Sequence, residues 1–380
     1  MPVRATKRGA DRTRLERDCD VIVCGASFAG LAVAAELAGA GAEVLVVDRY
    51  EIGERQTSAC GIPTQWLDAM DLAGSERQRF HDVLVHTPWR SSRWPLPWSF
   101  STFDYRELCA LLWERAGEAE FETATVTGRR GDTVLTDRGE LSAPLIVDAL
   151  GWRRVLSNRA PIQPPNARLS RGLEVHPPGT GRDMELWLDA SYVRAGYSWS
   201  FPARDELRVG VGSFWPTHHV KEPTVRLAGD LGLPPLGYQG NWIPHQLRRA
   251  TEDGVFFAGD SAGHCLPLTA EGIRTALYFG IACGRELRAV LAGQRSREQA
   301  LRGYGAFSDS HERKFHWLLN VQRAIGQMTP TRAVGQLVRA FESRRLTHWA
   351  FDRYLAIAPP SYVASASSAA ARRRPVPAAT

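Results

Sequence analysis

Two short glycine-containing segments of this chain carry the residue types of a dinucleotide site. In the first, Gly25-Ala-Ser-Phe-Ala-Gly30, Gly25 permits a tight turn and Gly30 lets a helix pack closely against a strand. Ser27 stands where the usual fingerprint has its middle glycine, and it is small enough to hydrogen-bond a phosphate. Asp48 follows at a distance where a carboxylate accepts hydrogen bonds from ribose hydroxyls. The segment therefore predicts a pyrophosphate bound at a helix N-terminus.

The second segment begins at Gly259-Asp-Ser-Ala-Gly-His264 and leads into a helix near Ile273. Asp260 would accept hydrogen bonds from ribityl hydroxyls. The N–H groups of Gly272 and Ile273 would face the pyrimidine edge of a flavin, where the helix dipole favours a reduced, anionic ring. Because the two segments lie far apart in the sequence, one long ligand must bridge them, and non-covalently bound FAD fits.

Three aromatic residues alternate along one expected strand, namely Tyr197, Trp199 and Phe201. Side chains two residues apart on a strand point to the same face. The pattern favours an aromatic wall beside the isoalloxazine ring, which would form an apolar substrate pocket with Trp199 close to the reaction. Aromatic residues also fill ordinary sheet cores, so that alternative stays open.

The elements that would position these residues alternate between buried strands and helices. Apolar runs at 20–25 and 43–48 flank an Ala/Leu-rich segment at 31–40, which is typical of a β-α-β unit. Residues 168–215 alternate apolar and polar positions, as in an antiparallel sheet. The Trp- and Pro-rich residues 83–103 predict an aromatic-lined excursion. Further helices are expected at 103–116, 271–291 and through most of 299–357, and further strands at 121–126, 133–136, 145–148 and 255–258.

This order of elements predicts an α/β protein with a Rossmann-type FAD-binding domain, an interleaved and mostly antiparallel β-sheet substrate domain, and C-terminal helices. The expected boundaries are a basic N-terminal arm at 1–14, a discontinuous FAD-binding domain at 15–80, 101–158 and 245–298, a substrate domain at 81–100 and 159–244, a helical region at 299–358, and a flexible tail at 359–380.

Taken together, the motifs resemble the geranylgeranyl reductase family of FAD-dependent oxidoreductases, part of the larger p-hydroxybenzoate hydroxylase-like group. The similarity rests on three segments: 25–30, 259–273, and Gly196-Tyr-Ser-Trp-Ser-Phe-Pro202. Three positions depart from the family pattern. Asp148-Ala-Leu-Gly151-Trp152 matches the family's Asp-Gly motif only loosely. Ala270 stands where the family has glycine, and Tyr105 stands where it has an arginine, with Arg106 one place on.

The resemblance implies further contacts to the cofactor and a role for one cysteine. Cys60 lies in a loop where family reductases often place a cysteine near the flavin, so its thiol would contact the cofactor and donate a proton. A buried, inert thiol is the alternative. Beyond Cys60 and the residues above, the implied cofactor contacts are Phe28, Ala29, Arg49, Arg55, Arg106, Val126 and Gly151.

Two other residues near the second segment have side chains that transfer protons. His264 follows the Gly-Asp pair and would act as a proton relay, or would simply fill space. Glu271 would act near the flavin edge, or would only cap the helix. No cluster of metal-binding residues is evident, and no metal is expected.

The resemblance implies an enzyme that reduces C=C bonds of an apolar, isoprenoid-like or natural-product substrate, using hydride from flavin N5 and a proton from a nearby acid. The alternative is a flavin-dependent monooxygenase that hydroxylates or epoxidises an aromatic or polyketide-like substrate on the same scaffold. A halogenase fits less well, because it needs an early active-site lysine and none lies between Lys7 and Lys221. No second Gly-rich β-α-β unit is present, so external NAD(P)H or a protein donor is expected to supply electrons.

Composition excludes several other classes. The net charge of +6 is spread along the chain, so no nucleic-acid partner is expected. Six dispersed cysteines without a CxxC pair, and no secretory signal, favour reduced thiols in the cytoplasm. No transmembrane segment is evident, although the arginines at 372–374 leave peripheral contact with a membrane open. The oligomeric state stays open.

Overall fold

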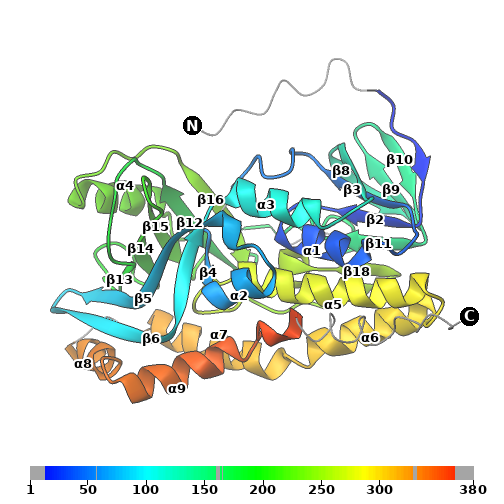
Figure 1. Ribbon diagram of the computed structural model, residues 1–380. Helices are drawn as coiled ribbons and strands as arrows, with labels where there is room; N and C mark the ends of the chain where they lie inside the picture. The colour runs from blue at the N-terminus through cyan, green and yellow to red at the C-terminus, as the bar shows by residue number, and fades with distance from the viewer. Residues whose placement is uncertain (1–12, 57, 160–162, 165, 328–331, 364–380) are drawn as a thin grey trace, which may run out of the picture.

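Three β-sheets and a set of helices make up this computed structural model, which describes residues 13–56, 58–159, 163–164, 166–327 and 332–363 (Figure 1). Most of the predicted N-terminal arm and residues 364–380 of the predicted C-terminal tail, including the arginines at 372–374, therefore lie outside the described residues. Within the described residues, no helix is long and apolar enough to cross a membrane.

A six-stranded sheet forms the predicted cofactor domain, in the order β17-β18-β11-β2-β3-β7. All of its strands pair in parallel except β17, which is antiparallel to β18. Continuous Val/Ile/Leu runs explain this arrangement, because strands of a parallel sheet are covered on both faces. The strands are β2 (Val21–Cys24), β3 (Val44–Asp48), β7 (Glu120–Thr123), β11 (Leu145–Asp148), β17 (Thr251–Glu252) and β18 (Val255–Phe257).

Two helices pack against each other on this sheet, α1 (Phe28–Leu37) and α5 (Ile273–Leu291). Glycines on α5 allow the close approach. A Cβ at Gly280 would lie 2.6 Å from the carbonyl oxygen of Ala29, and a Cβ at Gly284 would lie 2.5 Å from Cβ of Glu36. The crossing joins the two segments that the sequence assigns to the cofactor, because α1 and α5 begin where those segments end.

An eight-stranded sheet forms the predicted substrate domain, in the order β16-β12-β15-β14-β13-β5-β6-β4. Its pairs are antiparallel except for β13 with β5, which agrees with the predicted fold class. Helix α4 (Lys221–Asp230) covers one face through Leu227 and Ala228. The strands are β4 (Gly61–Pro63), β5 (Glu76–Thr87), β6 (Arg90–Phe103), β12 (Leu169–Val175), β13 (Glu185–Trp187), β14 (Gly196–Pro202), β15 (Leu207–Ser213) and β16 (Gln239–Pro244).

Residues 83–103 are a regular part of this sheet, and the prediction of an excursion was wrong. They lie in the long β5–β6 hairpin, which begins at Glu76. Pro95 and Pro97 hid the strand pattern, because proline cannot donate to a ladder. The sheet tolerates them because they lie next to a register shift, on an edge that β4 covers only at 100–102. The strands of this sheet thus extend beyond the predicted segment at 81–100.

A small four-stranded sheet, in the order β1-β10-β9-β8, lies beside the cofactor domain. The predicted strand 121–126 is divided in the structure: β7 belongs to the six-stranded sheet, and Val126 begins β8 of the small sheet. The strands are β1 (Arg17–Asp18), β8 (Val126–Arg130), β9 (Thr133–Thr136) and β10 (Gly139–Ser142).

The C-terminal part is helical, as predicted, and runs beneath both large sheets (Figure 1). Val338 of α8 packs against Phe80, Val83 and Val85 of β5. The helices are α6 (Arg297–Asp309), α7 (Glu312–Gln327), α8 (Arg332–Ala340) and α9 (Arg344–Leu355). The remaining short helices are α2 (Thr64–Ala69), η1 (Ala73–Ser75), α3 (Tyr105–Glu114) and η2 (Gly259–Ala262).

Candidate active site

The turn after β2 requires glycine at both ends. Gly25 has a φ of +112°, and a Cβ there would lie 2.3 Å from the carbonyl oxygen of Ala149. A Cβ at Gly30 would lie 1.8 Å from the carbonyl oxygen of Gly25. Any larger residue would move the strand and the helix apart, so the predicted functions of both glycines have a direct steric basis.

Asp48, at the end of β3, holds this turn in place. Its Oδ2 accepts a hydrogen bond from the Ala26 N–H at 2.8 Å, and its Oδ1 accepts one from the Tyr50 N–H at 2.9 Å. The guanidinium groups of Arg49 and Arg55 lie 4.8 Å and 5.1 Å from the Tyr50 ring centre. The structure therefore gathers one acid and two exposed cations at the end of β3, where the sequence predicts ribose and phosphate contacts.

Helix α1 begins without a side-chain cap, because its N-cap residue Ser27 accepts no hydrogen bond from the first turn. Instead the Ser27 Oγ lies 3.2 Å from the hydroxyl oxygen of Tyr105. The Phe28 ring packs edge-on against Phe103 and Tyr105. The first-turn N–H groups thus remain available to an anion. Tyr105, which stands where the family has an arginine, thus lies beside the start of α1, although no pattern in the sequence predicts that position.

Arg106, in contrast, lies on the exposed side of α3. Its Cα would be 2.9 Å from a Cβ at Gly53, so it contacts the loop after β3 through its backbone. Val126 is buried at the start of the small sheet. Their contacts to a cofactor stay predictions.

The two predicted cofactor segments touch in the folded chain. Gly259 has a φ of +63°, and a Cβ there would lie 2.9 Å from Cβ of Ala29. Next to it, the Ser261 hydroxyl donates to Asp148 Oδ1 at 2.7 Å and lies 3.0 Å from the carbonyl oxygen of Gly151. The contact brings the ends of β2, β11 and β18 together, so one extended ligand can reach both segments.

Asp260 is the residue that best fits a flavin. Its carboxylate accepts no hydrogen bond from any residue within the described ranges. Burial raises its pKa to about 6, and the positive charge of Arg248 acts in the opposite direction. Such a group needs a hydroxyl partner. Gly272, the N-cap of α5, lies beside it: a Cβ there would be 3.7 Å from Asp260 Oδ1, and α5 also starts without a side-chain cap. An unpartnered carboxylate beside two uncapped helix ends fits a ligand with both hydroxyls and phosphates.

Glu271 is held by partners on two helices. Its Oε1 accepts from Arg274 Nε at 2.7 Å and its Oε2 accepts from Arg274 Nη2 at 2.8 Å, while the Tyr354 hydroxyl of α9 also donates to Oε2. The Thr269 hydroxyl contacts the same Tyr354 hydroxyl at 2.6 Å, and the Tyr197 hydroxyl donates to the Thr269 carbonyl. Glu271 is therefore fully engaged within the protein, which favours a structural role. A role for it near the flavin stays a prediction.

His264 lies in the core between α5 and α6. Its ring stacks on Phe279 with centres 3.7 Å apart, and its Nε2 lies 3.0 Å from the Ser308 hydroxyl. Burial lowers its pKa well below the usual value, so the ring is neutral. These contacts favour packing over proton relay, and the relay stays a prediction.

Cys60 is fully buried just before β4, in a left-handed backbone conformation with a φ of +52°. Its Sγ donates to the Ser58 carbonyl at 3.2 Å. Burial raises the thiol pKa well above its usual value, although the nearby Arg208 acts in the opposite direction. The thiol is therefore protonated at neutral pH, which a proton donor requires, and burial also makes it a weaker acid than an ordinary thiol.

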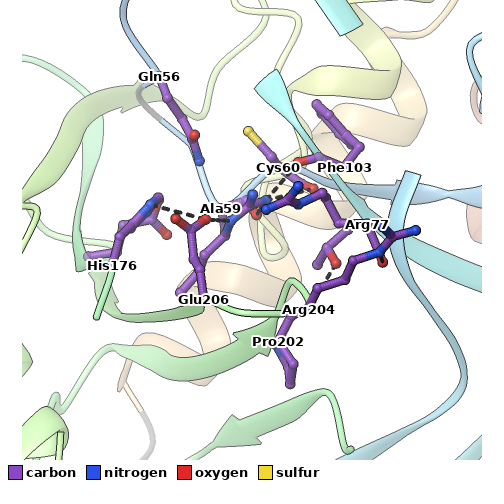
Figure 2. Close-up of polar contacts among 12 residues, drawn as sticks. Gln56, Ala59, Cys60, Arg77, Phe103, His176, Pro202, Arg204 and Glu206 are labelled. Carbon is purple, nitrogen blue, oxygen red and sulfur yellow. Dashed lines mark hydrogen bonds and ion pairs between the residues drawn. The ribbon is translucent and has the colours of Figure 1, made fainter. Parts of the chain in front are cut away.

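The aromatic residues of β14 lie on one face of the substrate sheet, as predicted from their spacing. Their antiparallel partners on β15 are Gly212 opposite Tyr197, Gly210 opposite Trp199 and Arg208 opposite Phe201. A Cβ at Gly210 would lie 2.2 Å from the Trp199 ring, so the indole lies on glycine backbone. Arg208 extends from the same face to the Cys60 loop, where its Nη1 donates to the carbonyl oxygens of Ala59 and Cys60. Figure 2 shows Ala59 and Cys60 of this loop near Glu206. The structure thus brings Cys60 and the aromatic face together.

Within the described part of the chain, no group of His, Cys, Asp and Glu residues could hold a metal ion. The candidate site is instead built from glycine turns, one unpartnered carboxylate, a protonated thiol and aromatic rings.

Comparison with known proteins gives three kinds of similarity. Residues 18–88 match the family described as FAD binding domain. A curated relative, digeranylgeranylglycerophospholipid reductase 3 of Methanosphaera stadtmanae, is 25% identical over 78% of this chain and 83% of its own.

Two solved structures share the fold. A geranylgeranyl bacteriochlorophyll reductase-like protein from Thermoplasma acidophilum superposes with a TM-score of 0.78 at 16% identity, covering 93% of this chain and all of its own. PqsL, a probable FAD-dependent monooxygenase from Pseudomonas aeruginosa, has a TM-score of 0.61 at 19% identity, covering 88% of this chain and all of its own. At these identities the two structures establish the fold alone. Together with the sequence matches, they confirm the predicted fold class and the resemblance to the geranylgeranyl reductase family.

Proposed function

Since the chain is an FAD-dependent oxidoreductase similar to the geranylgeranyl reductases, we propose that it saturates C=C bonds of an apolar, isoprenoid-like substrate. The observation that carries this proposal is the buried, protonated Cys60 thiol, in a loop whose Cys60 carbonyl accepts a hydrogen bond from Arg208, a residue on the aromatic face of the substrate sheet. Saturating a C=C bond requires a hydride and a proton, and this thiol would supply the proton.

When bound and reduced, FAD supplies the hydride. This chain would hold it with the residues that fit it: the turn at Gly25–Gly30 and the N-terminus of α1 for the pyrophosphate, Asp48 for the ribose, Asp260 for the ribityl hydroxyls, and Gly272 and Ile273 for the pyrimidine edge. The close approach of Ala29 and Gly259, where a Cβ on the glycine would lie 2.9 Å from Cβ of Ala29, would hold the two cofactor segments in a fixed relation.

The substrate class follows from the lining of the sheet. Tyr197, Trp199 and Phe201 present aromatic surface on the same face, and the polar groups that reach this face are paired within the protein. An apolar chain would gain from burial against such a surface, whereas a charged substrate would find no free partner among these side chains. The name of the curated relative, a reductase of a geranylgeranyl lipid, supports an isoprenoid.

The electron donor would be external, because a second Gly-rich β-α-β unit is absent from the sequence. NADPH, NADH and a reduced ferredoxin are the donors to compare, and anaerobic bleaching of the bound flavin measures each one directly.

The decisive experiment is turnover without oxygen. The flavin-loaded protein is reduced with dithionite under nitrogen and mixed with a geranylgeranyl glycerophospholipid. We expect the flavin to reoxidise and the lipid to gain two hydrogen atoms per turnover, as measured by mass spectrometry. Cys60→Ser should slow lipid reduction without slowing flavin reduction by the donor. A flavin that reoxidises only when air is admitted would contradict the proposal.

A monooxygenase is the second candidate, and the fold shared with PqsL favours it. It would show no anaerobic turnover and would incorporate labelled oxygen into its product. The same experiment therefore separates the two.

A further inference from the structure

Four charged side chains and one indole form a continuous chain through the substrate sheet. They are Arg208, Glu206, His176, Glu174 and Trp199, and we refer to them as the Arg208 network. Nothing in the proposed reduction uses the charged members directly. Their positions, however, connect the two parts of the site that the proposal does use, the Cys60 loop and the Trp199 ring.

Arg208 forms the first end. Its side chain is 2% exposed, and its Nη1 donates to the carbonyl oxygens of Ala59 at 2.9 Å, Cys60 at 3.4 Å and Phe103 at 2.9 Å. The Phe103 N–H in turn donates to the Cys60 carbonyl at 3.0 Å. These contacts fix the backbone around a residue with a φ of +52°, a conformation that non-glycine residues seldom adopt unless their surroundings enforce it.

The middle of the network balances charge. Glu206 Oε1 accepts from Arg208 Nε at 2.9 Å and lies 3.6 Å from His176 Nδ1. His176 Nε2 lies 2.8 Å from Glu174 Oε1. Burial alone would lower the pKa of His176, but hydrogen bonds to both carboxylates raise it to about 9, so the ring is an imidazolium at neutral pH. In Figure 2, Glu206 lies between His176 and the Cys60 loop.

Trp199 forms the second end. Its Nε1 donates to Glu174 Oε2 at 3.1 Å, so the two oxygens of Glu174 serve different partners. The indole also lies on backbone at three glycines of β12 and β15: a Cβ would be 2.2 Å from the ring at Gly210, 3.3 Å at Gly212 and 3.8 Å at Gly172. The glycine backbone beneath the indole fixes the plane of the ring, and the hydrogen bond to Glu174 fixes its rotation.

The desolvation of these buried charges costs stability, which indicates that the network has a role other than stabilising the fold. A buried ion-pair network is seldom more stable than well-packed apolar residues, because each charge loses its hydration. Two cations and two carboxylates nevertheless occupy positions next to the buried apolar residues Val175, Leu207 and Val209. Networks whose groups are all satisfied rigidify a core and specify one conformation.

We propose that the Arg208 network is a positioning device that holds the Cys60 loop and the Trp199 ring in one fixed arrangement at the substrate face. The catalytic meaning of this arrangement rests on the proposed reduction, but the arrangement itself can be tested without any substrate. The network's four charged members are positioning residues, since they act through Cys60 and Trp199.

The first test measures how well the Cys60 loop is held. Flavin-loaded wild-type protein, Arg208→Lys and Arg138→Lys are treated with iodoacetamide, and alkylation of each cysteine is followed by peptide mass spectrometry. A lysine ammonium cannot hold Glu206 and three carbonyls at once. Because local opening controls access to a buried thiol, we expect Arg208→Lys to alkylate Cys60 roughly tenfold faster or more. Cys109 and Cys283, buried in other elements, should keep their wild-type rates.

Arg138→Lys is the matched control, because this arginine has the same kind of contacts in the small sheet. Its side chain is 9% exposed and donates to Glu122 and to the Thr123 carbonyl. We expect wild-type alkylation of Cys60 in this variant. A wild-type rate in Arg208→Lys would overturn the proposal, as would equal acceleration in both variants.

The second test measures whether the two ends are coupled. In Glu174→Gln only one side-chain oxygen remains to accept from both His176 and Trp199. We expect roughly threefold or faster alkylation of Cys60 in this variant, at the far end of the network, through the same local opening. In Arg208→Lys, the near-ultraviolet circular dichroism signal of Trp199, isolated by subtracting the Trp199→Phe variant in each background, should change. If each contact acted only locally, Cys60 alkylation in Glu174→Gln and the Trp199 signal in Arg208→Lys would both stay at their wild-type values. That result would overturn the proposal.

Thermal unfolding and flavin content are recorded first for every variant. If Arg208→Lys does not fold, Glu174→Gln decides alone, since it removes no buried cation. The outcomes also separate the two proposals. A wild-type protein that reduces no lipid, with Cys60 and Trp199 signals that are coupled, would contradict the proposed reductase and support the positioning device. A wild-type protein that reduces lipid, with signals that are not coupled, would support the reductase and contradict the positioning device.

Discussion

At the scale of single residues, the site contains charged side chains whose role becomes clear only from their contacts in the folded sheet. Arg208 and Glu174 stand in strands that alternate apolar and polar positions, and Glu206 comes directly before one of them, so nothing in the sequence pattern singled these residues out. Their contacts could not be predicted, because they depend on the register of β12, β14 and β15. The glycines of the cofactor turns could be predicted, in contrast, because the steric requirement of a turn is local and visible in the sequence.

Ala270 gives a prediction about stability. It has a φ of +52° where the family has glycine, and a left-handed conformation costs an alanine about 1 kcal/mol or more. Ala270→Gly should therefore raise the free energy of unfolding by up to about 1 kcal/mol, as measured by urea denaturation. Ala110→Gly, at an exposed position in the middle of α3, should lower it by about 1 kcal/mol. A loss of stability in both variants would show that Ala270 is not strained.

Asp260 gives a prediction about the cofactor. Its carboxylate has no partner among the described residues and a pKa of about 6, raised by burial. A ribityl hydroxyl would donate to the charged form, so FAD affinity should rise as the pH increases through about 6. Asp260→Ala should bind FAD about tenfold more weakly or worse and lose this pH dependence, because hydrogen bonds to charged groups contribute about 1.5–3 kcal/mol.

Fluorescence titration of apoprotein with FAD at several pH values measures this directly. Asp309→Ala, which removes an exposed aspartate of α6, serves as the control and should bind FAD like the wild type. An unchanged pH dependence in Asp260→Ala would assign the effect to another group.

At the scale of elements, the sequence predicted those with a clear period. The β-α-β unit at 20–48 and the long helix α5 follow from apolar runs and composition, and both are present. The β5–β6 hairpin was missed because Pro95 and Pro97 interrupt its alternation. Tyr354, a partner of Glu271, could not be expected at all, since 83 residues separate them and only the packing of α9 brings them together.

The crossing of α1 and α5 is the element contact on which the cofactor site depends. A Cβ at Gly280 would be 2.6 Å from the Ala29 carbonyl oxygen and 2.9 Å from Cβ of Ala32. Gly280→Ala should therefore push the helices apart and destabilise the protein by about 1–3 kcal/mol, with weaker FAD binding, because both cofactor segments end at this crossing.

Gly229 of α4 is the matched control, since a Cβ there would meet nothing within 4 Å. Gly229→Ala should stabilise the protein by about 0.5–1 kcal/mol through helix propensity alone. Both variants are compared by urea denaturation and FAD titration. If Gly280→Ala stabilises as Gly229→Ala does, the helices have room to spare and the crossing does not fix the site.

At the scale of the whole molecule, the C-terminal helices join the two large units. The Arg274 guanidinium of α5 donates to the carbonyls of Leu355 and Ala358, and the Trp66 indole of α2 also donates to Ala358. On the substrate side, the Trp94 indole of β6 donates to the Val338 carbonyl of α8. The C-terminal helices thus contact both the cofactor unit and the substrate sheet. Charged groups in either unit therefore contribute to the stability of the whole molecule.

These charged groups set how stability depends on pH. Hydrogen bonds to Glu174 and Glu206 outweigh burial and raise the pKa of His176 to about 9 from an ordinary 6.5, so the stability it contributes is present below pH 6.5 and is lost as the pH rises toward 9. Burial lowers the pKa of His245 to about 4 and lowers those of His264 and His311, so their contribution is lost as the pH falls below 6.5. Stability should therefore be greatest near pH 6.5.

His176→Gln separates the two arms of this profile. Glutamine cannot become a cation, so the decline above pH 6.5 should flatten, whereas the decline between about pH 6.5 and 4, to which His245 contributes, should remain. At roughly 1.4 kcal/mol for each unit of pKa, the wild-type protein should lose on the order of 3 kcal/mol between pH 6.5 and 9, and the variant should lose much less. Urea denaturation at several pH values gives the free energy of unfolding for both proteins. A parallel alkaline decline in wild type and variant would mean that His176 is not held as an imidazolium, and the charge balance of the Arg208 network would then have to come from a protonated carboxyl group.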